Sequence, residues 1–111
     1  MEKEEVLSLV WAMFLKCTSN EVPFCLNYWR NELSIYPNEE RNYIECVNIV
    51  LNNGPRGENS PNSLMVNVPK VGYMIVDLTD EETIEVKRYL DSVVKVSNVN
   101  TVEAIKTIAK L

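Results

Sequence analysis

Hydrophobic and polar side chains alternate most regularly in the second half of the chain. Residues 64–68 carry aliphatic side chains at every second position, and residues 71–76 continue with the same period of two. This period is typical of β-strands, because successive side chains point to opposite faces of a sheet. The intervening residues 69–72 include Pro69 and Gly72, which favour a turn. The pattern therefore predicts a β-hairpin.

A helix start follows this hairpin directly. Residues 79–82, Thr-Asp-Glu-Glu, fit the capping box. In this motif the threonine hydroxyl accepts a hydrogen bond from a first-turn amide, and the last glutamate side chain reaches back to the threonine amide. Negative charge in a first turn also suits the positive end of the helix dipole. Hydrophobic residues at helical spacing then predict one helix over residues 80–96 and, from Asn100, a final helix to the C-terminus.

Three further helices are predicted in the first half, over about residues 3–18, 20–34 and 37–53. The second has Asn20 as a cap and Pro23 near its first turn, and the third has hydrophobic residues at spacings of three and four. The first is hydrophobic on almost every side, and such a helix is normally buried all round. We therefore expect it to be central in the domain or partly covered by another subunit.

These elements predict an α+β domain that is mostly α, with about five helices and one β-hairpin between the third and fourth helices. A length of 111 residues suits a single domain with one hydrophobic core. Within residues 1–111 we expect a helical half over residues 1–53, a flexible polar loop over residues 54–63, and the hairpin with two helices over residues 64–111.

Charge narrows the classes of partner and compartment. The formal net charge is -5, so the average field of the protein repels nucleic acid, and any contact with it must use a local basic patch. The N-terminus is acidic, and the chain contains no run of about 20 apolar residues, so neither a secretory signal nor a membrane span is indicated. We expect a cytoplasmic protein with no membrane partner.

The residue types argue against catalysis. The chain contains no histidine, which excludes Cys-His and Ser-His-Asp sites. Cys17, Cys25 and Cys46 include no close pair, so they do not form a typical zinc site. We expect them to be small buried hydrophobic residues, with one disulfide as the alternative. The acidic residues 39–40 and 80–82 suit first helical turns better than magnesium sites, so no catalytic residue, metal or cofactor is expected and the protein is not predicted to be an enzyme.

The predicted order of three helices, a hairpin and a helix resembles the winged-helix layout, and residues 73–90 are similar to its final wing strand and following helix. In that family the third helix enters the major groove and the hairpin tip touches the DNA backbone. The resemblance implies that Arg41, Asn42, Glu45 and Asn48 would read the groove and that Lys70 would be the wing contact. Glutamates on the same helix predict weak binding by the isolated chain. The residues predicted to contact nucleic acid are Arg41, Lys70, Lys87, Arg88, Lys95 and Lys106.

Aromatic residues supply the predicted protein interface. Trp11 and Phe14 lie on the hydrophobic first helix, and Tyr28 and Trp29 precede Arg30. The second pair suits a core position, a protein interface or a base-stacking surface. The sequence favours a small non-catalytic interaction or assembly subunit, bound to itself or to another protein, within a larger complex that could contain nucleic acid. The alternatives are a winged-helix-like nucleic-acid-binding protein or regulator and, last, an enzyme that uses carboxylates alone.

Overall fold

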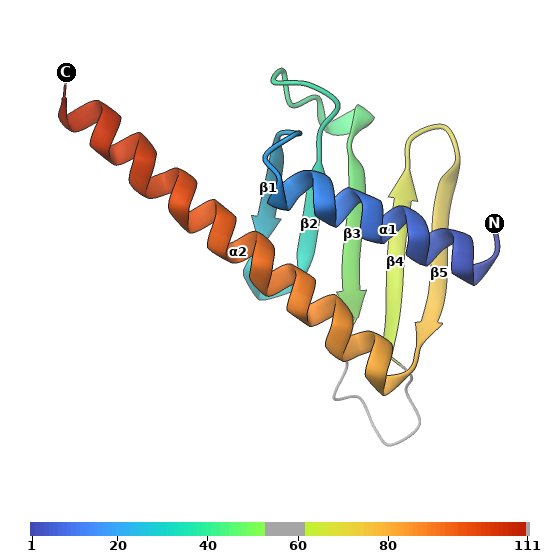
Figure 1. Cartoon of the computed structure of the whole chain (residues 1–111). Helices are drawn as coiled ribbons and strands as arrows, with labels where there is room; N and C mark the ends of the chain where they lie inside the picture. The colour runs from blue at the N-terminus through green and yellow to red at the C-terminus, as the bar shows by residue number, and fades with distance from the viewer. Residues whose placement is uncertain (53–61, 111) are drawn as a thin grey trace.

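A five-stranded antiparallel sheet forms one layer of the molecule, and two α-helices form the other (Figure 1). The structure is a computed structural model that describes residues 1–52 and 62–110, with the side chains of residues 98–104 outside this description. The elements in chain order are α1 (Lys3–Thr18), β1 (Phe24–Asn27), β2 (Glu32–Ile35), β3 (Val47–Asn52), β4 (Asn62–Val68), β5 (Gly72–Leu78) and α2 (Asp80–Ala109), with short 3-10 helices at Tyr28–Arg30 and Tyr43–Glu45. The strands lie side by side in chain order, so each pairs with the next.

Both helices cover the same face of the sheet (Figure 1). Alternate side chains of the strands point toward the helices and are buried in the core. Leu33 lies opposite Ile49, and Ile49 lies opposite Val66, in a row that crosses the central strands. Such rows arise because every second side chain of a strand points to the same face. The buried core consists of Val6, Val10, Phe14, Cys17, Leu33, Ile35, Ile49, Leu51, Leu64, Val66, Leu78, Val86, Leu90 and Val93.

The helix predicted over residues 3–18 is confirmed as α1. Val6, Val10 and Phe14 are buried and stand four residues apart, which places them on one side of the helix. Leu15, in contrast, is 57% exposed. The expectation that this helix is central and buried all round is therefore wrong, because α1 lies on the surface of the sheet and beside α2 (Figure 1).

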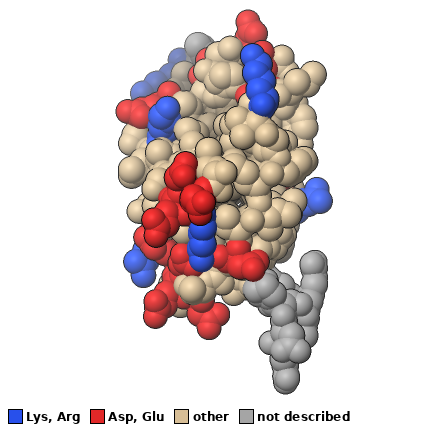
Figure 2. All heavy atoms as spheres, turned by 90° about the vertical axis from the view of Figure 1, so that its right-hand side faces the viewer, with Lys and Arg blue, Asp and Glu red and all other residues tan. Residues whose placement is uncertain are grey.

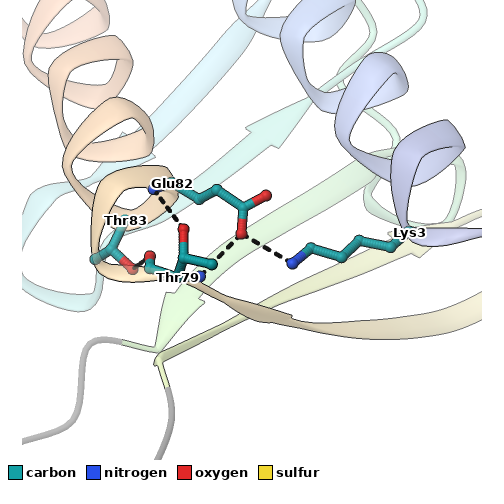
Figure 3. Close-up of polar contacts among 4 residues, drawn as sticks. All are labelled: Lys3, Thr79, Glu82 and Thr83. Carbon is teal, nitrogen blue, oxygen red and sulfur yellow. Dashed lines mark hydrogen bonds and ion pairs between the residues drawn. The ribbon is translucent and has the colours of Figure 1, made fainter.

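The two helices start close together at the β5 side of the molecule, where acidic side chains gather (Figure 2). The predicted capping box is confirmed there: Thr79 Oγ1 accepts from the Glu82 N–H at 3.1 Å, and Glu82 Oε1 accepts from the Thr79 N–H at 2.9 Å (Figure 3). Lys3 Nζ donates to the same oxygen at 2.8 Å and so joins α1 to α2. Because α2 continues to Ala109, the two predicted final helices are one helix of 30 residues.

The predicted helices over residues 20–34 and 37–53 are wrong, and with them the mostly helical fold of about five helices and one hairpin. The first of these segments contains β1, a 3-10 turn and part of β2, and the second contains a loop, another 3-10 turn and β3. Hydrophobic residues at spacings of two, three and four occur together in these short segments, so the helical spacing was not diagnostic. Backbone hydrogen bonds to neighbouring strands stabilise these segments as strands, and β-branched residues such as Val47 and Ile49 fit well in a sheet.

The hairpin predicted after residue 64 is confirmed as β4 and β5, but the winged-helix layout is wrong because three helices do not precede it. Arg41 and Asn42 lie in the loop between β2 and β3, and Asn48 lies in β3. Most of the loop predicted over residues 54–63 lies outside the described residues, and its last two residues, Asn62 and Ser63, belong to β4.

Candidate protein-interaction surface

The chain passes from β1 to β2 through a tight turn made of Tyr28–Arg30 and Asn31. Tyr28–Arg30 form a 3-10 turn, and Asn31 follows in the left-handed conformation with a φ of 50°. Asparagine adopts this conformation more readily than most residues. The Asn31 N–H donates to the Tyr28 carbonyl at 3.2 Å, and the Asn31 carbonyl accepts from the Leu51 N–H at 3.0 Å. These hydrogen bonds hold the turn against β3.

This turn presents two aromatic rings to solvent. Trp29 is 91% exposed and Tyr28 is 58% exposed, so the alternative that they belong to the core is wrong. Their rings meet edge to face, with centroids 6.0 Å apart and planes at 78°, which is a favoured geometry for aromatic pairs. The turn therefore exposes a pair of aromatic rings on the surface of the described part of the chain.

A cavity of about 220 Å³ lies beside the turn and is lined by Leu26, Tyr28, Asn31, Lys87, Leu90 and Asp91. It is smaller than the roughly 300–1,000 Å³ of typical small-molecule sites. Its lining combines two leucines with one basic and one acidic side chain. The cavity is therefore small, and its lining is of mixed polarity.

Comparisons of the chain with protein-family models, curated proteins and solved structures found no match. Within the described part of the chain, no helix combines the length and hydrophobicity needed to cross a bilayer.

The structure separates the four aromatic residues predicted for a protein interface. Trp11 and Phe14 pack on Tyr89 of α2, with ring centroids 5.0 and 5.5 Å from it, respectively. Phe14 is fully buried in the folded chain, whereas Tyr28 and Trp29 lie on the exposed turn. A role for Trp11 and Phe14 in an interface stays a prediction.

The six basic residues predicted to contact nucleic acid lie on three different parts of the fold. Arg41 is in the loop between β2 and β3, where its guanidinium lies 5.9 Å from the centre of the Tyr36 ring. Lys70 occupies the turn between β4 and β5, with a φ of 69°. The others, Lys87, Arg88, Lys95 and Lys106, are distributed along α2. Nucleic-acid contact by these residues stays a prediction.

The three cysteines are free. Burial raises the pKa of the Cys17 thiol from 9.0 to about 12, and a thiol that stays protonated is a poor nucleophile and metal ligand. Cys46 is also buried, and burial raises its pKa. Cys25 is exposed on β1, so the expectation of burial is wrong for this residue. The alternative of a disulfide is also wrong.

Several other ionisable groups lie around a second cavity. This cavity, of about 360 Å³, is lined by residues 20–24 together with Glu39, Arg41 and Ser97. Its charged groups are carboxylates and one guanidinium, which cannot act as a base because it keeps its proton. Across the described residues, no three His, Cys, Asp or Glu side chains are placed to hold a metal ion.

Sequence reasoning missed the exposed hydrophobic residues of β5. Tyr73 is 71% exposed and Ile75 is 62% exposed, whereas Met74 and Val76 pack against the core. Both alternating sets of this strand are hydrophobic, so the period of two did not indicate which set faces inward. Asp77 shares the phase of Tyr73 and Ile75, and its charge is the signal that could have identified the solvent side.

Proposed function

We propose that this chain is a small non-catalytic subunit that binds another protein through the turn formed by Tyr28–Arg30 and Asn31, here named the Trp29 turn. The observation that carries the proposal is the 91% exposure of Trp29 on a turn that is hydrogen-bonded to β3. Trp, Tyr and Arg are the residue types most enriched at the energetic centres of interfaces, and all three stand consecutively here. Because the turn is held before binding, little conformational entropy is lost on association.

The cavity beside the turn supports the same mode of binding. A partner that buries Trp29 would bring its own surface next to the leucines of this cavity, where one of its side chains could be covered. Lys87 and Asp91 lie one helical turn apart and both line the cavity. Charges at the rim of an interface set orientation and association rate more than affinity. We expect these two residues to orient the partner.

Catalysis forms no part of this proposal. The chain lacks histidine, and the raised pKa of Cys17 makes its thiol a poor nucleophile. We also propose the cytoplasm as the compartment, because three free thiols suit a reducing environment.

Affinity capture with three forms of the tagged chain tests this function. The forms are wild type, Trp29→Ala, and Tyr43→Ala as the matched control, since Tyr43 is 70% exposed in the other 3-10 turn. We expect wild type and Tyr43→Ala to retain the partner and Trp29→Ala to lose it. With the purified partner, loss of such an anchor should raise the Kd by roughly 30-fold, the equivalent of about 2 kcal/mol.

Fluorescence provides a second readout. Trp11→Phe leaves Trp29 as the sole tryptophan of the chain, so its emission should move to shorter wavelength when the partner covers it. Circular dichroism should show that Trp29→Ala folds normally, because this side chain contributes little to the core. Equal partner recovery by all three forms, with no change in Trp29 emission, would refute the proposal.

A further inference from the structure

β5 is an edge strand that pairs with β4 and lies at the end of the sheet order. It is seven residues long, contains neither proline nor lysine, and has Asp77 as its single charged residue. Proteins normally protect an edge by making it short, by placing lysine or proline on it, or by a bulge. The opposite edge strand, β1, is short, with four residues. Apart from the charge of Asp77 near its end, β5 has none of these protections, and its outer edge is open to pairing with another strand.

Exposed hydrophobic side chains accompany this edge. Tyr73 and Ile75 are 71% and 62% exposed on the open face of the sheet, which is the face away from the helices. Their neighbours on β4 are Asn67 and Met65, respectively. A strand added beyond β5 would cover both exposed side chains and would extend the hydrophobic row of Met65 and Ile75 by one position.

Carboxylates gather on the helix side of the same edge. Figure 2 looks onto the β5 side of the molecule and shows acidic groups over the starts of the helices, next to a largely uncharged surface. Glu4 and Glu5 belong to the first turn of α1, and Asp80 and Glu81 to the first turn of α2. Lys3 is paired with Glu82, so it does little to offset this group. The local field attracts cations.

We propose that β5 binds an extended basic segment of another protein as a sixth strand of the sheet. Side chains of a strand point alternately to its two faces. The segment would therefore carry hydrophobic residues toward the open face, beside Tyr73 and Ile75, and lysine or arginine toward the helix face, near the carboxylates. Backbone hydrogen bonds supply affinity in this mode of recognition, and the side chains supply register and specificity.

The charges favour such a segment over a second copy of this chain. Antiparallel pairing of two β5 strands about a twofold axis would keep the helices of both copies on one face of the joined sheet. The acidic groups of both copies would then lie on the same face of the joined sheet, and juxtaposed like charges suppress association. A basic segment, in contrast, would be attracted by these carboxylates.

This surface is separate from the Trp29 turn, which lies between β1 and β2 at the other end of the strand order. The two proposals can therefore fail independently. Trp29→Ala should leave binding at β5 unchanged, so the same variant distinguishes them.

Fluorescence anisotropy with a labelled peptide tests the proposal on the full chain. The probe is an acetylated peptide of about ten residues in which valine or threonine alternates with lysine. We expect saturable binding that weakens as salt rises, because exposed charges are screened. Hydrogen exchange should show that the peptide slows the outward amides of β5 and leaves those of β1 unchanged, since backbone pairing protects the amides that it covers.

Matched controls separate charge from backbone pairing. Glu4→Lys with Glu5→Lys should weaken binding about tenfold, whereas Glu39→Lys with Glu40→Lys makes the same change in net charge in the loop between β2 and β3 and should have little effect. A peptide with glutamate in place of lysine, or one with alternate amides N-methylated, should not bind.

Three results would overturn the proposal. The first is equal binding of the glutamate peptide. The second is that the lysine peptide does not bind, or that it binds without slowing hydrogen exchange in β5. The third is a dimer in light scattering whose β5 amides are already protected, which would show that a second copy occupies the edge.

Discussion

Glu82 is the residue at which the starts of the two helices meet. Its carboxylate accepts hydrogen bonds from the Lys3 ammonium and from the Thr79 amide (Figure 3). These bonds lower the pKa of Glu82 below 4.5 in the folded chain, and the bond from Lys3 has the largest effect. The side chains of Lys3 and Glu82 are 42% and 25% exposed, respectively, so solvent limits the pair to at most about 1 kcal/mol.

Glu82→Gln should lower the free energy of unfolding by about 0.5 kcal/mol at neutral pH. Glutamine can still accept the capping hydrogen bond, so the loss reports the charge. Because the pKa is lower in the folded state, the contribution of Glu82 is complete above pH 4.5 and is lost as the pH falls through the folded value. Urea unfolding at pH 7 and at pH 3 measures the difference. Glu85→Gln removes the same charge from an exposed position of α2, and an equal loss in both variants at both pH values would contradict the prediction.

Packing between α1, α2 and the inner face of the sheet holds the elements together. Phe14 is fully buried, and its ring centroid lies 5.5 Å from that of Tyr89 on α2. Removal of a large side chain from such a site loses its transfer free energy and leaves a cavity that neighbouring side chains fill only in part. The next residue, Leu15, is 57% exposed, so the helix offers a buried and an exposed position side by side.

Phe14→Ala should destabilise the chain by about 3–5 kcal/mol, whereas Leu15→Ala should change its stability by no more than about 0.5 kcal/mol. Urea unfolding monitored by circular dichroism compares the two. If Phe14→Ala does not fold, Phe14→Leu leaves a smaller cavity and should show a smaller loss in the same direction. Equal effects at positions 14 and 15 would show that the packing of α1 differs from the one described.

The whole molecule is elongated, with dimensions of 54 × 30 × 20 Å. A helix of 30 residues is about 45 Å long, and five strands span roughly 20–25 Å. The C-terminal part of α2 therefore extends beyond β1 (Figure 1). Basic residues along α2 and carboxylates at the helix starts also give the molecule an uneven distribution of charge.

Binding of the isolated chain to duplex DNA should be weak, with a Kd above about 10 μM at physiological salt. Phosphate neutralisation supplies most non-specific affinity, and the net charge of -5 opposes it. Anisotropy titrations of a labelled duplex at two salt concentrations measure this affinity. Lys87→Ala with Arg88→Ala should change little. Submicromolar binding that these substitutions weaken would restore α2 as a nucleic-acid surface.

Local signals in the sequence were enough for α1, for the hairpin of β4 and β5, and for the capping box at Thr79. Each depends on residues close together in the chain: a long hydrophobic run, a proline and glycine between two alternating segments, and a threonine three residues before a glutamate. The sequence also identified Tyr28 and Trp29 as interface candidates from residue type. Such features can be recognised from sequence because their determining contacts are local.

Tertiary structure alone decided the rest. β1, β2 and β3 are short or of mixed period, and they become strands because neighbouring strands satisfy their backbone hydrogen bonds. The faces of β5 were also undecided until the helices covered one side of the sheet and left Tyr73 and Ile75 on the other. Trp29 is exposed for the same reason: the turn between β1 and β2 lies at the end of the sheet, beyond the reach of the core. Strand pairing and coverage by distant segments determine which segments are strands and which side chains are exposed. A short stretch of neighbouring residues does not contain this information.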